Sequence, residues 1–269
     1  MKLKKTTLAL ALVSLAAFQT THAAQAPAIV GSWYFAHPPT VYAVATFLED
    51  GTFFLATDHP DGSDPNGFEW GTYVWDPTTG KLDTPSFLID TNGESGFSSS
   101  FGGQTYITIS NNSILVGDNI GSTSGSRILP GSSPIVGTWV LPGAPLMVSF
   151  LGDGTYFMAE GGDADADGQP GIERGTYSWD ADTGKLMATQ IFTDTNGGWG
   201  ASDPELGYFV ATFTANGSLA IQEAGAATLY LQAAPVPEPE TWAMMLAGMG
   251  LVGFAARRRK TNFGVHKKS

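Results

Sequence analysis

The sequence contains no cysteine. Disulfide bonds, thiolate nucleophiles and cysteine-based metal sites are therefore excluded. A chain without these cross-links depends on an apolar core for its stability. Its central part, about 210 residues, is long enough for one large domain or two small ones.

Histidine is nearly absent, with four residues in the whole chain. Only His37 and His59 lie away from the two ends. A serine hydrolase needs a histidine base beside a positioned serine, and no nucleophile-elbow motif is present. Zinc sites need three or four ligands, mostly histidine, cysteine or carboxylate, so the supply for zinc is also thin. We expect loop or turn positions for both histidines, and a protein that is not an enzyme.

Basic residues are rare in the body of the chain, residues 25–236. This body holds four of them against 23 acidic residues, which gives a formal charge of −19. Nucleic acid and anionic membrane surfaces are poor partners for such a charge, whereas cations are attracted to it. We expect no nucleic-acid partner.

The N-terminus, residues 1–24, has the pattern of a secretory signal peptide. Three lysines precede an apolar run from Leu8 to Phe18, and small residues follow. This run is too short for a helix to span the ~30 Å hydrocarbon core of a membrane. We predict a signal helix here, export through the Sec translocon, and cleavage after Ala23 or Ala24.

The C-terminal segment, residues 235–260, has three consecutive parts. The first is an extended proline motif: Pro237, Glu238 and Pro239. An uncharged apolar stretch, 241–256, comes next and gives about 24 Å of helix, close to a full membrane span. The third part is a basic cluster: Arg257, Arg258, Arg259 and Lys260. By the positive-inside rule the cluster and the tail 261–269 stay cytoplasmic, with the body outside.

These three parts in this order resemble the PEP-CTERM sorting signal. In that family an exosortase, a membrane enzyme, is thought to cut near the motif and release or re-anchor the protein. The resemblance implies an exosortase partner, inner-membrane anchoring before processing, and a final place at the cell surface or outside the cell. It also implies coexistence with exopolysaccharide production. A plain single-span anchor is the alternative interpretation.

The body of the chain is an internal duplication, with offsets of 103 to 106 residues between matching motifs. Two copies are too few for a solenoid and indicate two tandem domains, 25–131 and 132–234. The clearest matching pairs are Gly71-Thr72-Tyr73 with Gly175-Thr176-Tyr177, and Asp90-Thr91-Asn92-Gly93 with Asp194-Thr195-Asn196-Gly197.

Each copy alternates short apolar runs with tight turns. Asp50-Gly51 and Asp153-Gly154 separate apolar runs, which is a strong hairpin signal, and no stretch keeps a helical period. The fold class is therefore all-β, with two tandem antiparallel meander barrels or sandwiches of about eight strands each. In the second copy we expect strands to start near Val136, Leu146, Thr155, Gly175, Lys185, Tyr208, Ser218 and Thr228.

The first strand of each copy carries Gly-x-Trp, ending at Trp33 and at Trp139. This short motif resembles the opening of lipocalin and calycin barrels, in which an arginine from the last strand covers the tryptophan. Arg127 is placed to cover Trp33, and Tyr230 stands at the corresponding place in the second copy. The likeness concerns the fold, and a pair of barrels that bind a small apolar molecule becomes an alternative function.

An acidic loop in the second copy is a candidate calcium site. Asp163, Asp165 and Asp167 alternate before a glycine, as in the first half of an EF-hand loop. The twelfth position is Arg174, with Glu173 beside it, and strands flank the loop. A calcium site made by these four carboxylates and a solvated acidic hairpin loop both remain open.

Two tryptophans and two glutamates are residues of the types that bind or cleave polysaccharides. Trp70 and Trp199 do not recur in both copies, so they are candidate carbohydrate contacts, whereas the recurring tryptophans are expected in the core. Glu69 and Glu173 do recur, which favours a structural role for them. A glycosidase would need two carboxylates ~5–9 Å apart in an open cleft.

The sequence as a whole predicts an exported structural or adhesion protein of an exopolysaccharide matrix or biofilm, processed by an exosortase. No cofactor is expected, unless the acidic loop binds calcium. Two alternatives stay open: a calycin-like ligand-binding barrel pair and a secreted glycosidase. A sizeable apolar cavity in each barrel would distinguish the ligand-binding alternative from the structural role.

Overall fold

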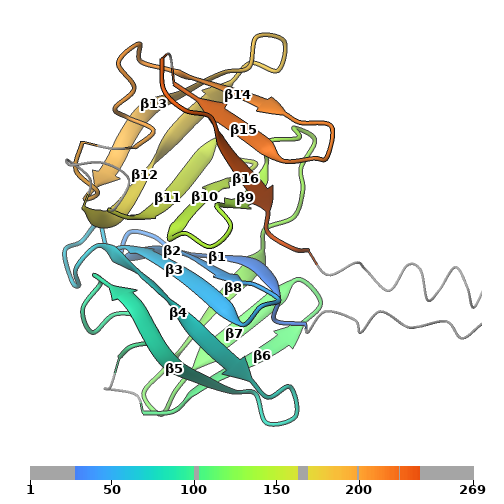
Figure 1. Ribbon diagram of the computed structural model, residues 1–269. Helices are drawn as coiled ribbons and strands as arrows, with labels where there is room; N and C mark the ends of the chain where they lie inside the picture. The colour runs from blue at the N-terminus through green and yellow to red at the C-terminus, as the bar shows by residue number, and fades with distance from the viewer. Residues whose placement is uncertain (1–27, 100–102, 163–168, 199, 224, 237–269) are drawn as a thin grey trace, which may run out of the picture.

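The computed structural model describes residues 28–99, 103–162, 169–198, 200–223 and 225–236. The predicted signal helix and C-terminal membrane helix lie outside these residues. Among the residues described, no helix is long and apolar enough to cross a membrane. The chain forms two closed antiparallel barrels of eight strands, one above the other in Figure 1. The all-β tandem-barrel prediction is thereby confirmed.

Both barrels are meanders, in which each strand pairs with the next and the last pairs with the first. The first barrel consists of β1 (Gly31–His37), β2 (Val41–Phe47), β3 (Thr52–Asp58), β4 (Gly67–Trp75), β5 (Lys81–Asp90), β6 (Thr105–Ser110), β7 (Ser113–Gly117) and β8 (Ser122–Arg127). The second consists of β9 (Gly137–Val140), β10 (Leu146–Phe150), β11 (Thr155–Gly161), β12 (Pro170–Trp179), β13 (Lys185–Asp194), β14 (Phe209–Phe213), β15 (Leu219–Gln222) and β16 (Leu229–Ala233).

In the second copy the strand starts agree with the predicted ones to within one residue, apart from β12. This strand begins at Pro170, five residues before the predicted start at Gly175. The charged residues Glu173 and Arg174 suggest a loop in the sequence, but both side chains are buried. Backbone pairing with β11 keeps the segment extended, and contacts described below bury the two charged side chains.

A tryptophan closes one end of each barrel. Trp33 is fully buried, and its indole nitrogen donates a hydrogen bond to the carbonyl oxygen of Ile29 at 2.9 Å. Trp139 makes the same bond to Ile135 at 2.8 Å. The short segment before each first strand is thereby fixed across the barrel end.

Arg127, the last residue of β8, covers this end of the first barrel. Its guanidinium carbon lies 3.9 Å from the centroid of the Trp33 ring. It also donates hydrogen bonds to the carbonyl oxygens of Val30 and Ala28, at 2.6 and 2.7 Å. The arrangement that the calycin resemblance implies is therefore present in this barrel.

The second barrel has no arginine in the corresponding register. Trp33 pairs with Arg127, and Trp139 pairs with Ala233. The prediction that Tyr230 takes this place is wrong, because β16 runs three residues further before it reaches β9. Within the described part of the second barrel, Trp139 therefore has no cation from the last strand above its ring.

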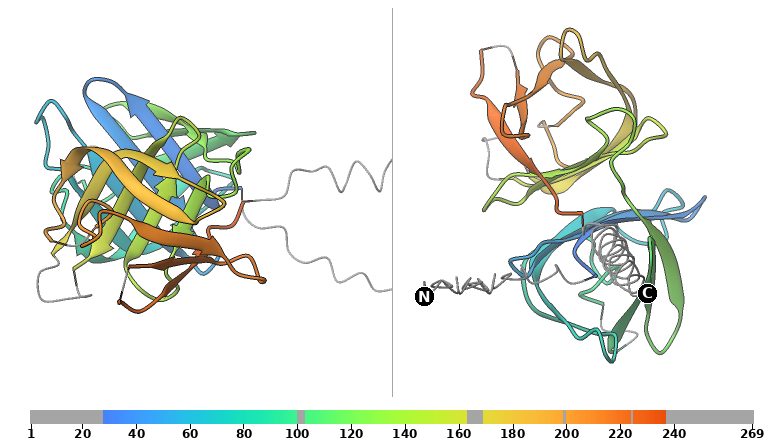
Figure 2. Two further views of the ribbon diagram at one scale, coloured as in Figure 1. Left: turned by 90° about the horizontal axis from the view of Figure 1, so that it is seen from above. Right: turned by 90° about the vertical axis from the view of Figure 1, so that its right-hand side faces the viewer.

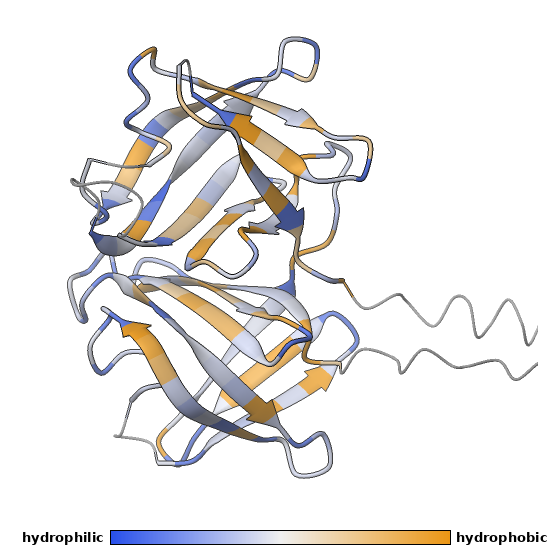
Figure 3. Cartoon of the chain, viewed as in Figure 1, coloured by the Kyte–Doolittle hydropathy of each residue, from blue (hydrophilic) through white to orange (hydrophobic). Residues whose placement is uncertain are grey.

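The two barrels share an apolar interface formed by the outer faces of β2–β4 and β10–β12. The right view of Figure 2 shows the two barrels packed one above the other. Strand side chains alternate, so Phe53 and Leu55 point into the first barrel while Phe54 and Ala56 point to the interface. Hydrophobic residues accordingly concentrate on the strands in Figure 3. The members of the interface cluster include Val44, Phe54, Ala56, Phe68, Met147, Phe157, Ala159 and Ile172.

Candidate functional site

Each barrel contains a cavity at the end opposite its tryptophan. The cavity volume is about 470 Å³ in the first barrel and about 480 Å³ in the second. These values lie within the range of about 300–1,000 Å³ that is typical of small-molecule sites. Inward-facing residues of the strands form the cavity walls. The other half of each barrel, around the tryptophan, is filled by side chains.

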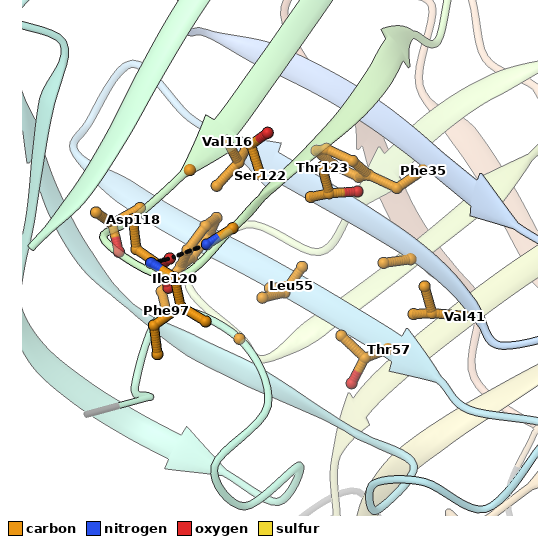
Figure 4. A pocket seen from close by; sticks show the side chains of 15 residues that line it. Phe35, Val41, Leu55, Thr57, Phe97, Val116, Asp118, Ile120, Ser122 and Thr123 are labelled. Atoms are coloured by element: carbon orange, nitrogen blue, oxygen red, sulfur yellow. Dashed lines mark hydrogen bonds between the residues drawn. The ribbon is translucent and has the colours of Figure 1, made fainter. Parts of the chain in front are cut away.

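Both cavities have mainly apolar walls. The first is lined by Phe35, Val41, Ala43, Leu55, Phe97, Val116 and Ile120, most of which are labelled in Figure 4. The second is lined by Leu146, Val148, Phe150, Met158, Leu186, Phe209, Ile221, Leu229 and Leu231. Binding of an apolar molecule against walls of this kind is favourable, because apolar surface of both the molecule and the wall is removed from water.

A long loop completes the wall of each barrel. β5 and β6 pair only at Lys81 and Leu82, near the closed end, and β13 and β14 likewise pair only at Lys185 and Leu186. Beyond these pairs the connecting loop turns into the barrel. In the first barrel Phe97 from this loop packs against Phe53 inside, with ring centroids 5.4 Å apart.

A buried glutamate holds the loop in the first barrel. Glu69, on β4, is fully buried and accepts hydrogen bonds from the backbone amides of Phe97 and Ser98, both at 2.9 Å. A side chain at Gly96 would place its Cβ 2.5 Å from the Glu69 Oε1 atom, so this position requires glycine. Burial raises the pKa of Glu69 to about 7, although the two hydrogen bonds act in the opposite direction.

In the second barrel the equivalent glutamate, 104 residues further along the chain, holds the loop in the same way. Glu173, also fully buried, accepts hydrogen bonds from the backbone amide and hydroxyl of Ser202, at 3.3 and 3.0 Å. The Tyr156 hydroxyl donates a third hydrogen bond. Gly200 lies against the carboxylate, as Gly96 does in the first barrel. Burial again raises the pKa of the glutamate.

The hydrogen bonds that tie Glu69 and Glu173 to these loops were not predicted, although the sequence contains a signal for them. Gly96-Phe97-Ser98 recurs as Gly200-Ala201-Ser202, at the same 104-residue offset as Glu69 and Glu173. The recurrence of the glutamates did favour a structural role, and their contacts agree with that role. What the sequence does not show is that each carboxylate faces backbone amides inside a barrel.

Glu173 is also part of a group of three carboxylates. One oxygen each of Glu173, Asp194 and Asp203 lies within 4.8 Å of the others, and the two aspartates are exposed. Carboxylate oxygens are suitable ligands for calcium. Asp163, Asp165 and Asp167, the other predicted ligands, lie outside the described residues. Calcium binding therefore stays a prediction.

Of the two predicted carbohydrate contacts, Trp70 and Trp199, only Trp70 lies among the described residues. Trp70 is partly buried and stacks on Phe54, with ring centroids 6.2 Å apart, at the edge of the interface between the barrels. This packing already uses one face of the indole. Trp199 lies outside the described residues. Carbohydrate binding by these two side chains stays a prediction.

His59 lies close to a serine and an aspartate. Its Nε2 atom is 2.9 Å from Ser95 Oγ, whereas Nδ1 is 3.8 Å from Asp64 Oδ2, beyond hydrogen-bond distance. The two backbone amides that follow Gly96 are bonded to Glu69, so they do not form an oxyanion hole beside Ser95. The geometry favours a loop-stabilising role for His59, in the β3–β4 connection. His37 ends β1 and bonds Thr123 at 2.7 Å.

The comparisons with known proteins concern the tail of the chain. A family model described as the PEP-CTERM protein-sorting motif matches residues 235–260. Comparison with curated proteins and with solved structures gives no significant match. The resemblance of the tail to a PEP-CTERM signal is therefore confirmed. This motif implies export and membrane-anchored processing by an exosortase.

Proposed function

We propose that this protein is an exosortase-processed carrier, exposed at the cell surface or outside the cell, whose two barrels bind small apolar molecules. The observation that carries the proposal is the apolar cavity of about 470–480 Å³ in each barrel. A sizeable cavity in each copy is the feature that distinguishes a ligand-binding barrel pair from a purely structural one. No catalytic activity is included in the proposal.

The distribution of packing within each barrel supports a binding role. Small eight-stranded barrels are commonly filled by their own side chains. Here the closed end is filled around Trp33 and Trp139, whereas the other half of each barrel is hollow. Unfilled apolar volume lowers the free energy of unfolding, so a fold with only a structural role has no use for it.

A structural or adhesive role in an exopolysaccharide matrix is the second candidate. The sorting motif at residues 235–260 favours it, because the resemblance to that family implies coexistence with exopolysaccharide production. The acidic body, with its charge of −19, would hold cations in such a matrix. Binding of the purified protein to the polysaccharide of its own cells, abolished by salt, is the expected result for this role.

Titration with the neutral fluorophore N-phenyl-1-naphthylamine tests the carrier proposal. Val116→Trp would fill the first cavity. Ile221→Trp, at the corresponding inward position of β15, would fill the second. The folded mature protein should show two sites, each variant one, and the double variant none.

Outward-facing substitutions on neighbouring strand positions serve as controls. Leu115→Trp on β7 and Val210→Phe on β14 change exposed side chains of the same barrels. Both should keep two sites. Binding that survives in the folded double variant, or the absence of binding in the unchanged protein, would contradict the carrier proposal.

A further inference from the structure

The two cavities have similar volumes and apolar walls, but their charged residues differ. The first has one carboxylate in its lining, Asp118. The second has three: Asp203, Glu205 and Glu223. Neither lining contains a lysine or arginine among the described residues. Duplication of one fold has thus produced two cavities of different electrostatic character.

We propose that the second barrel selects amphipathic organic cations, with an apolar chain and an ammonium head, whereas the first takes neutral apolar molecules. This inference rests on the proposed carrier function. The apolar chain would occupy the space among Val148, Met158 and Leu231. The head group would remain at the loops that carry the three acids.

Asp118, the single acid of the first cavity, bonds to the backbone of the turn in which it lies. Asp118 Oδ1 accepts hydrogen bonds from the backbone amides of Ile120 and Gly121, at 2.7 and 2.8 Å. These bonds lower the pKa of Asp118 and stabilise its charge locally. When β7 is aligned with β15, Glu223 is the counterpart of Asp118. The Oε1 atom of Glu223 accepts a hydrogen bond from the backbone amide of Glu205 at 2.5 Å.

The second barrel therefore differs chiefly by Asp203 and Glu205. Ser99 stands in the first copy where Asp203 stands in the second. One carboxylate oxygen of Asp203 lies within 4.8 Å of an oxygen of Asp194, and two like charges this close repel each other. An ammonium group at this mouth would relieve that repulsion while its chain fills the apolar cavity.

A bare metal ion is a weaker match to this cavity as a whole. Metal ions gain nothing from apolar walls, and strongly hydrated ions lose their water shell there. An anionic amphiphile would meet three carboxylates at the mouth. A neutral amphiphile would gain the apolar contact alone. The combination of apolar wall and acidic rim thus favours an organic cation.

Competition with matched ligands tests the inference. Decyltrimethylammonium and 1-decanol share a ten-carbon chain, and each would displace N-phenyl-1-naphthylamine from the mature protein. Ile221→Trp leaves only the first cavity for measurement, and Val116→Trp leaves only the second. Because the body charge of −19 attracts cations to both cavities, the decisive quantity is the ratio of cation to alcohol affinity in each.

We expect this ratio to be roughly tenfold higher in the second cavity at low salt, and to fall as ionic strength rises. Asp203→Asn with Glu205→Gln should lower it to the value of the first cavity and leave decanol binding unchanged. Equal ratios in the two cavities, with decanol bound in both, would overturn the inference alone. Failure of decanol to bind in either cavity would instead overturn the carrier function on which the inference rests.

Discussion

The Nε atom of Arg174 lies 2.5 Å from Oδ2 of Asp58, so a buried ion pair joins the second barrel to the first. Thr193 donates a hydrogen bond to the other carboxylate oxygen at 2.7 Å. The guanidinium carbon also lies 4.1 Å from the centroid of the Tyr42 ring. Both charges are thus satisfied within an otherwise apolar interface. The pair is therefore a directional polar contact between the two barrels.

Removing either partner of this pair should lower the free energy of unfolding. Asp58→Asn or Arg174→Met leaves the other charge buried without its partner, which costs about 3–5 kcal/mol. The double variant should lose less than the sum of the two single losses, because no charge remains unpaired. Urea unfolding at neutral pH measures all four proteins. Additive effects, or single losses below about 1 kcal/mol, would show that the pair does not tie the barrels together.

The pKa of Glu69 predicts an unusual dependence of stability on pH. Its value in the folded protein is about 7, against an ordinary 4.5, because burial disfavours the charged form. Between these two pH values the folded protein holds a proton that the unfolded chain releases. The free energy of unfolding should therefore fall as pH rises from about 4.5 to about 7, and the group adds no slope above that. The difference corresponds to roughly 3 kcal/mol.

Glu69→Gln tests this dependence because glutamine does not titrate. The variant should show a shallower decline in the free energy of unfolding between pH 5 and pH 7.5, measured in urea. The residual slope belongs in part to Glu173, whose pKa burial also raises, so the double Gln variant should be flatter still. Glu49→Gln, an exposed control, should keep the full slope. An identical slope in Glu69→Gln would contradict the prediction.

The fold was predictable because its signals are local. Asp-Gly turns mark the hairpins, and alternation over Leu146–Leu151 indicates a strand with two different faces. The structure confirms the alternation: Leu146, Val148 and Phe150 face the barrel interior, and Met147 and Leu151 face the other barrel. Burial of both faces was not predictable, because it depends on how the two copies pack.

The candidate site was less predictable because its parts are distant in sequence. Glu69 meets a loop 28 and 29 residues away, and Arg174 meets Asp58 from the other copy. Neither contact leaves a periodic signal. The cavities depend on which inward side chains leave space unfilled, and composition does not encode that. The duplication, by contrast, was visible and assigned corresponding positions to both glutamates.

Arg127 should contribute strongly to the stability of the first barrel. Arg127→Met removes the guanidinium from the Trp33 ring and leaves the carbonyl oxygens of Val30 and Ala28 without these donors. We expect a loss of about 2–3 kcal/mol in the free energy of unfolding, measured in urea by tryptophan fluorescence. Lys185→Met is the matched control, because Lys185 also lies over a ring, that of Tyr208, but is exposed. A loss in Arg127→Met no larger than the control's would show that covering Trp33 does not stabilise the barrel.

The sorting motif predicts a change in size and location that depends on an exosortase. With the exosortase gene deleted, the protein should accumulate unprocessed in the inner-membrane fraction, because nothing cuts near residues 237–239. Substitution of these three residues by alanine should have the same effect in cells with the enzyme, whereas Asn262→Ala, beyond the matched segment, should be processed normally. Immunoblots and intact-mass measurements of membrane, surface and medium fractions report both quantities. Processing that continues unchanged without the enzyme would contradict the exosortase assignment, because another protease must then cut the tail.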